Sequence, residues 1–131
     1  MVQLNLKLGI DYRTVEYEEQ MSKVLNSADL IVSRAGGSIT AEINLLGLPS
    51  ILIPLPGAPG DHQTKNAESL AVDGRAVIIP DENCTGGRMA EEIKGIVLHE
   101  ERLMNMGKSR YPKSEKNAAE KIATLLIEVA K

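Results

Sequence analysis

The residues best suited to chemistry lie where an apolar run of the sequence gives way to a helical pattern. Residues 29–38 read DLIVSRAGGS, so two glycines, Gly36 and Gly37, stand at the junction. Glycines let a ligand approach the main chain closely, and the free N–H groups that open a helix favour an anion. The junction is therefore a candidate binding site for a diphosphate. The alternative is a tight strand–helix turn that needs glycine for packing. The glycines alone do not decide, because the pattern is neither GxGxxG nor a P-loop.

Two charged residues flank these glycines. Arg34 directly follows the apolar run, where a guanidinium group at the rim of a sheet can complement a phosphate or a carboxylate. Glu42 falls four residues beyond Ser38, where a carboxylate can accept hydrogen bonds from the diol of a ribose. Each residue also has a simpler interpretation. Arg34 can be a solvated or salt-bridged arginine, and Glu42 can be an acid that is favourable near a helix N-terminus without any ligand.

A second polar cluster follows the next apolar run, PSILIP, and opens another helical pattern. Gln63 and Asn66 are three residues apart, which places their amide groups on one helical face, where they can hydrogen-bond sugar hydroxyls. The cluster should lie at the same sheet edge as the glycines, because parallel strands all end at one edge. Asp61 is interpreted as the N-cap of this helix and His62 as a surface residue.

The remaining reactive side chains do not indicate a metal site or a nucleophile. Neither His62 nor His99 has the partner spacing of a metal ligand, and Cys84 has no histidine or second cysteine nearby. We therefore expect no metal and no cofactor. A single cysteine excludes an internal disulfide, which suits a reducing compartment.

The elements that must position these residues alternate along the chain. Apolar or alternating runs predict strands at residues 13–17, 29–33, 49–54 and 75–80. Helical periodicity predicts helices at residues 18–28, 38–47, 62–74, 88–98, 100–109 and 114–130. Gly47 and Gly74 are expected to stop two of these helices, and Thr85 to cap another. The alternation predicts an α/β fold, a Rossmann-like parallel sheet with flanking helices. About four strands make a small sheet, so we expect the chain to be a piece of something longer.

Composition limits the partners of the chain. Of the 131 residues, 43% are hydrophobic but only 2% are aromatic, so the core must be aliphatic. The formal net charge of -3 argues against binding to a phosphate backbone, and we expect no nucleic-acid partner. No apolar run approaches the ~18 residues of a membrane span, and the N-terminus lacks the apolar stretch of a signal peptide. We expect a cytoplasmic location, and association with a membrane surface stays open.

Most of the chain resembles a known family of enzymes. Residues 28–79, ADLIVSRAGGSITAEINLLGLPSILIPLPGAPGDHQTKNAESLAVDGRAVII, are similar to the C-terminal, donor-binding half of the bacterial MurG transferase family. The specific parts are SRAGGSITAE and DHQTKNA, in this order and at this spacing. The resemblance implies the C-terminal half of a GT-B glycosyltransferase. It also implies inverting transfer of N-acetylglucosamine from UDP-N-acetylglucosamine to lipid I in peptidoglycan synthesis.

The resemblance implies roles for the residues of the glycine turn. Arg34, Gly36, Gly37 and Ser38 match the turn whose backbone holds the diphosphate of the donor, and Glu42 matches the acid that binds the ribose hydroxyls. These groups would stabilise the charge that builds on the leaving UDP, in the place of a metal ion.

Further roles follow from the same resemblance for the sugar and the base. Gln63 matches a glutamine that contacts the N-acetylglucosamine hydroxyls, and Asn66 matches an asparagine nearby in the same helix. Tyr17 and Met21 would pack near the uracil, and Glu18 would present its backbone to the edge of the base.

The chain also departs from the family. Thr64 stands where some relatives have a second glutamine, so contacts to the sugar can differ. The N-terminal domain, which binds the lipid-linked acceptor and is expected to supply the general base, is not visible. We therefore expect residues 1–131 to form a single donor-binding domain, truncated at its N-terminus, from a two-domain enzyme. The full enzyme would be peripheral on the inner face of the cell membrane, and no catalytic residue is assigned here.

Two other functions remain open from the sequence. The chain can be a separate donor subunit that needs a membrane partner. The split eukaryotic enzyme that adds the second N-acetylglucosamine to dolichol diphosphate is built in this way. It can also be a regulatory module that binds an anionic metabolite, in which case it should show no preference for uracil.

Overall fold

The computed structural model describes residues 14–16 and 18–108, and in this part of the chain it contains a three-stranded sheet. The strands are β1 (Ile31–Ser33), β2 (Ser50–Leu52) and β3 (Ala76–Ile78), all parallel and in the order β1-β2-β3. The register pairs Val32 with Ile51 and Ile51 with Val77. The predicted strands at 29–33, 49–54 and 75–80 are therefore confirmed, with the predicted parallel arrangement.

Helices connect these strands along the described chain. The α-helices are α1 (Met21–Ser27), α2 (Gly37–Leu46), α3 (His62–Ala71), α4 (Gly86–Val97) and α5 (Glu100–Met106). Two 3-10 helices, η2 (Pro59–Asp61) and η3 (Asp81–Asn83), lie in the loops that follow β2 and β3. Because α2 joins β1 to β2 and α3 joins β2 to β3, each link is the helical crossover that parallel strands require.

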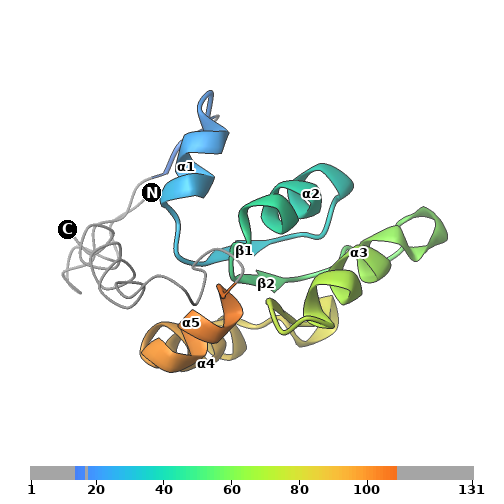
Figure 1. Cartoon of the computed structure of the whole chain (residues 1–131). Coiled ribbons are helices and arrows are strands. Elements are labelled where there is room, and N and C mark those ends of the chain that lie inside the picture. Colours follow the sequence, from blue (N-terminus) through green and yellow to red (C-terminus); the bar gives the residue numbers. More distant parts are fainter. Residues whose placement is uncertain (1–13, 17, 109–131) are drawn as a thin grey trace.

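Helices cover both faces of the sheet, as Figure 1 shows. Ile51 and Leu52 of β2, and Ile53 directly after it, send their side chains to alternate faces of the sheet. The core under α1, α2 and α3 contains Leu25, Ala35, Ile43, Leu48, Leu52, Ala67, Leu70 and Ala76. The core under α4 and α5 contains Ile51, Ile53, Ile79, Ile96, Leu103 and Met106. Both cores are aliphatic, as the composition requires.

The ends of the helices follow from local sequence. Gly47 and Gly74 have positive φ angles of 65° and 75°, the left-handed conformation that ends a helix and that glycine adopts without strain. Thr85 caps α4, because its side chain accepts a hydrogen bond from the backbone N–H of Arg88 at 3.1 Å. The predicted stop at Gly47 and the predicted cap at Thr85 are confirmed, whereas α3 ends at Ala71 with Val72 as its C-cap, before Gly74.

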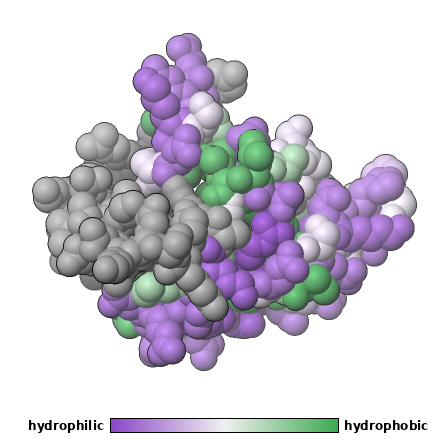
Figure 2. Space-filling model, in the orientation of Figure 1, coloured by the Kyte–Doolittle hydropathy of each residue, from purple (hydrophilic) through white to green (hydrophobic). Residues whose placement is uncertain are grey.

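The strand predicted at residues 13–17 is not present where the structure describes this segment. Residues 14–16 form no strand, and Val15 is 63% exposed, so this short segment has no buried side chain to hold it against the sheet. In α1 only Leu25 is buried, whereas Met21 and Val24 are exposed. Figure 2 shows a further hydrophobic patch over α2, the helix that contains the exposed Leu45. Residues 1–13 and the predicted helix at 114–130 lie outside the described residues.

A cluster of charges holds α4 against α5. Glu92 of α4 accepts hydrogen bonds from Arg88, one turn earlier in the same helix, and from Arg102 of α5 at 2.9 Å. Arg102 also donates to the carbonyl of Gly95 at 3.2 Å. A Cβ atom added to Gly95 would lie only 3.1 Å from Nη1 of Arg102. The hydrogen bond from Arg88 is the largest cause that holds the pKa of Glu92 below its ordinary value, against the opposing effect of burial.

A Glu92→Gln variant should therefore be less stable than the wild type at neutral pH, by up to about 1 kcal/mol. Because the pKa of Glu92 is lower in the folded protein, its charge stabilises the fold above the ordinary pKa of 4.5, and this effect is lost as the pH falls through the folded value. Urea unfolding at pH 7 and at pH 3 measures the difference. The exposed neighbour Glu91, changed to Gln, is the control. A deficit of equal size at both pH values would contradict the assignment.

Candidate functional site

All three described strands end at one edge of the sheet, and the loops that follow them carry most of the predicted site residues. β1 leads into Arg34 and the glycine turn, β2 leads into the loop before α3, and β3 leads into η3. In an open parallel sheet this edge is where ligands bind.

The glycine turn has an open geometry. Gly36 is the N-cap of α2 with φ -64° and ψ 158°, an extended conformation that any residue adopts, and Gly37 is the first helical residue. A Cβ atom built on either glycine would meet nothing within 4 Å. Within the described residues, neither backbone strain nor close packing explains why these two residues are glycine.

The N-terminus of α2 is also uncapped by any side chain. The first backbone hydrogen bond of the helix runs from Thr40 N–H to the carbonyl of Gly36 at 3.1 Å, so the amides before it lie beyond the helical ladder. With the helix dipole, such amides favour an anion. Ser38, in this first turn, is exposed.

Two amide side chains of α3 hold the residue before the glycines. Gln63 Oε1 accepts a hydrogen bond from the backbone N–H of Ala35 at 3.2 Å and a second from that of Leu55 at 2.9 Å. Asn66 Nδ2 donates to the carbonyl of Ala35 at 3.0 Å. Ala35 is fully buried, so these bonds satisfy both polar groups of a residue that water does not reach. The predicted sheet edge is right, but the sequence did not reveal this clamp.

Arg34 crosses the ends of the strands and forms an ion pair. Its Nη1 donates to Asp81 Oδ1 at 2.6 Å and lies 3.4 Å and 3.5 Å from the carbonyl oxygens of Ile53 and Pro54. The side chain is 49% exposed, so it is both salt-bridged and open to solvent. The structure thus contains the salt bridge that the simpler interpretation of Arg34 predicts. Whether Arg34 also binds a phosphate is not tested by these contacts.

Other predicted site residues are not brought to the turn by any described contact. Glu42 is exposed on α2, and Met21 is exposed at the start of α1, which packs beside α2. Glu18 uses its carboxylate to accept the backbone N–H of Gln20 at 2.9 Å. Tyr17 lies outside the described residues.

Asp61 and His62 begin α3 in an unusual way. Asp61 occupies the N-cap position, as predicted, but with φ 54° and no capping hydrogen bond from its side chain. Gly60 has φ 63°, and a Cβ there would lie 2.9 Å from the ring of His62. His62 itself is exposed, as expected.

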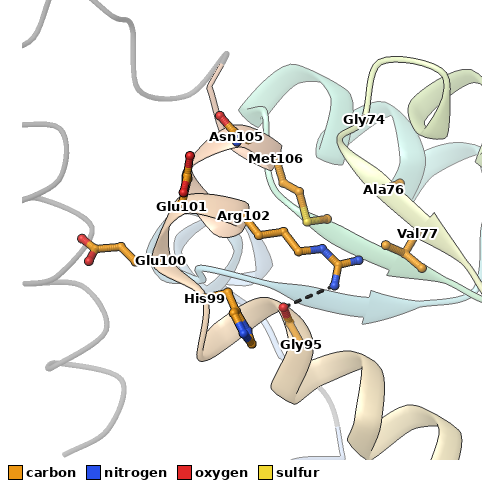
Figure 3. Close-up of a pocket in the computed structure, with 10 residues that line it drawn as sticks. All are labelled: Gly74, Ala76, Val77, Gly95, His99, Glu100, Glu101, Arg102, Asn105 and Met106. Carbon is orange, nitrogen blue, oxygen red and sulfur yellow. Dashed lines mark hydrogen bonds between the residues drawn. The ribbon is translucent and has the colours of Figure 1, made fainter.

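Two cavities lie at opposite ends of β3, and only one of them is near the predicted site. One of about 540 Å³ lies at the ends of β2 and β3, and its lining includes Leu55, Thr64, Asp81 and Glu82. Another of about 920 Å³ lies beside the start of β3, at the opposite end of the strand, where Figure 3 shows Arg102 reaching toward Gly95. The first cavity adjoins the ion pair of Arg34, whereas the second is not part of the predicted site.

The described residues contain neither a cluster of metal ligands nor a helix that could span a membrane. Residues 14–16 and 18–108 contain no group of three or more histidine, cysteine, aspartate or glutamate side chains that could hold a metal ion. In the same residues, every helix is too short or too polar to cross a bilayer.

Comparison with known proteins assigns this chain to a family. Residues 2–125 match the family described as the glycosyltransferase family 28 C-terminal domain. The UDP-N-acetylglucosamine–N-acetylmuramyl-(pentapeptide) pyrophosphoryl-undecaprenol N-acetylglucosamine transferase of Desulforamulus reducens is 47% identical over 93 residues, which are 71% of this chain and 25% of that protein. The enzyme of the same name from Azotobacter vinelandii is 34% identical over 123 residues, which are 94% of this chain and 35% of that protein.

A solved structure has the same fold. The crystal structure of Acinetobacter baumannii MurG matches with a TM-score of 0.66 and 28% identity, over 88% of this chain and 35% of that chain. This chain thus spans between a quarter and about a third of the length of these relatives. Its parallel sheet with flanking helices corresponds to the C-terminal part of MurG, a GT-B fold, which confirms the predicted fold class. The chain belongs to the glycosyltransferase family 28 C-terminal domain family.

Proposed function

We propose that this chain is the part of an inverting glycosyltransferase that binds UDP-N-acetylglucosamine, and that the enzyme transfers N-acetylglucosamine to lipid I in peptidoglycan synthesis. The observation that carries the proposal is the open, uncapped glycine turn at Gly36 and Gly37, in a domain of this family. The names of the related enzymes suggest the sugar nucleotide and the acceptor.

In the proposed complex, the diphosphate lies against the first amides of α2. Each negative charge near a helix N-terminus gains about 0.3–1 kcal/mol from the dipole when exposed, and more when partly buried. Arg34, half-exposed at the same edge, adds guanidinium N–H donors whose positive charge is partly balanced by Asp81. Because these groups are already fixed, they stabilise the charge that develops on the leaving UDP without reorganisation.

The remaining contacts are assigned by position in the family pattern. Glu42 binds the ribose hydroxyls, Gln63 and Asn66 lie on the sugar side, and Tyr17, Glu18 and Met21 contact the uracil. The Nε2 of Gln63 supports its assignment, because the described hydrogen bonds of this side chain use only Oε1. The Nε2 amino group of Gln63 is therefore left to donate to a hydroxyl of the sugar.

We place the rest of the reaction outside this chain. Residues 1–131 form a single donor-binding domain of a two-domain enzyme, and the general base and the site for the lipid-linked acceptor belong to the other domain. The enzyme works in the cytoplasm, peripherally at the inner face of the membrane, where its acceptor is anchored.

Titration of the chain with UDP, UDP-N-acetylglucosamine and ADP tests this function by NMR. Both uridine nucleotides should bind, with shifts at the amides of Gly36, Gly37 and Ser38, and ADP should bind more weakly. Equal affinity for UDP and ADP would instead indicate a general anion-binding module. The absence of binding to all three would refute the proposal.

A Gln63→Glu variant distinguishes the structural role of Oε1 from the proposed role of Nε2 in binding the sugar. Glutamate keeps the oxygen that accepts from Ala35 and Leu55, so the fold should persist, but it cannot donate to a sugar hydroxyl. The preference for UDP-N-acetylglucosamine over UDP should fall by about 2- to 10-fold, the value of one neutral hydrogen bond. The ratio cancels the repulsion that the added charge exerts on both ligands. Asn105→Asp, the same amide-to-acid change at an exposed residue of α5, should leave the ratio unchanged. An unaltered ratio in Gln63→Glu would remove Gln63 from the sugar site.

A further inference from the structure

The ion pair between Arg34 and Asp81 joins the ends of all three described strands. Arg34 follows β1, its Nη1 lies near the two carbonyls that follow β2, and Asp81 begins η3 after β3. The two residues are 47 positions apart in the sequence. Their contact is therefore a product of the parallel sheet, which brings the three loops to one edge.

The guanidinium of Arg34 makes these contacts through a single nitrogen atom. Nη1 makes all of the hydrogen bonds described for the Arg34 side chain. Among the described residues, its Nε and Nη2 have no partner. A guanidinium carries five donors in a rigid planar fork, so fixing Nη1 also fixes the direction of the free edge.

Asp81 belongs to a turn that backbone hydrogen bonds hold together. The carbonyl of Asp81 accepts the N–H of Cys84 at 3.1 Å, and that of Pro80 accepts the N–H of Asn83 at 2.9 Å. The carboxylate is 39% exposed and lines the cavity of about 540 Å³. Asp81 thus gives the flexible Arg34 side chain a fixed anchor.

We propose that Asp81 is a positioning residue for the donor. It holds Nη1 of Arg34 across the strand ends, so that Nε and Nη2 are directed to the diphosphate. This inference rests on the proposed function. The opposite role, in which Asp81 competes with the phosphate for Arg34, is less consistent with the contacts, because the phosphate can use the free edge while Nη1 keeps its ion pair with Asp81.

A double-mutant cycle tests the proposal, with UDP as the probe and calorimetry as the measurement. Asp81→Ala should weaken UDP binding by about 3- to 10-fold, because Arg34 loses its anchor. Asp81→Asn keeps an acceptor oxygen for Nη1, and its affinity should stay within about twofold of the wild type. In an Arg34→Ala background, Asp81→Ala should cause no further loss. Glu82→Ala removes a charge from the same cavity without touching Arg34, and serves as the control.

A second measurement reports on Arg34 without any ligand. The ¹⁵N relaxation of its Nε–H group should show a more mobile side chain in Asp81→Ala than in the wild type or in Asp81→Asn. If UDP binds and Arg34→Ala weakens it, but Asp81→Ala equals Glu82→Ala or binds more tightly, the positioning role is overturned and the proposed function stands. If the wild-type chain does not bind UDP, the proposed function fails, and this inference fails with it.

Discussion

A Gly36→Val variant is expected to lose affinity for UDP by about 10- to 100-fold while it stays folded, since side chains forced into an occupied space cost about 1–3 kcal/mol. Gly36 has an ordinary extended backbone, and a Cβ there would meet nothing within 4 Å. The Cβ of a valine therefore meets no clash in the free protein. In the complex, its side chain would fill the space through which the diphosphate reaches the amides of α2.

Calorimetric titration with UDP and urea unfolding, on the same sample, measure the two effects separately. The free energy of unfolding should stay within about 1 kcal/mol of the wild type, because no core contact or left-handed conformation is involved. Gly86→Val is the matched control, since Gly86 also lies at a helix start with nothing within 4 Å of its Cβ position. A Gly36→Val variant that folds and binds UDP normally would show that the ligand does not approach this turn.

An Asn66→Asp variant is expected to lose about 1–3 kcal/mol of folding stability, which is a large share of the total for a domain of this size. Asn66 Nδ2 donates to the carbonyl of Ala35, which is fully buried. Aspartate has almost the same shape, but it places an oxygen against that carbonyl in place of a donor. The carbonyl is then buried without a partner and faces a negative charge.

Urea unfolding measures this loss, and amide hydrogen exchange locates it. Ser69→Ala is the control, because the Ser69 hydroxyl donates only to a carbonyl of its own helix, one turn earlier, and its removal should change stability little. Exchange should increase at Ala35 and its neighbours in the glycine turn. Wild-type stability in Asn66→Asp would mean that the hydrogen bond contributes nothing to the fold.

Much of this fold follows from local sequence signals. Short aliphatic runs between polar residues are typical of strands that are covered on both faces, and β2 fits this pattern with all three residues buried. Helix α3 ends at Ala71, three residues before the left-handed Gly74, but a left-handed glycine and a threonine side chain do mark one end each of α2 and α4, so Gly47 and Thr85 were predictable. Residues 14–16 were not, because alternation in so short a segment says nothing about whether a neighbouring strand is there to receive it.

The site is less accessible to such reasoning. Sequence spacing puts Gln63 and Asn66 on one helical face, and the parallel sheet puts that face near the glycines. The identity of their partners, however, is set by tertiary packing. The pairing of Arg34 with Asp81 depends on the order of three strands, and Asp81 carried no signal of its own. The sequence therefore located the edge and several of its residues, but not the contacts among them.

One oxygen atom, Oε1 of Gln63, accepts the N–H groups of both Ala35 and Leu55. Ala35 leads into the glycine turn, and Leu55 forms part of the wall of the neighbouring cavity. The two loops consequently share a single reference point and cannot drift apart without breaking a bond at this atom. Under the proposed function, a donor held at the glycine turn would keep a fixed position relative to this cavity wall, because few internal motions separate the two loops.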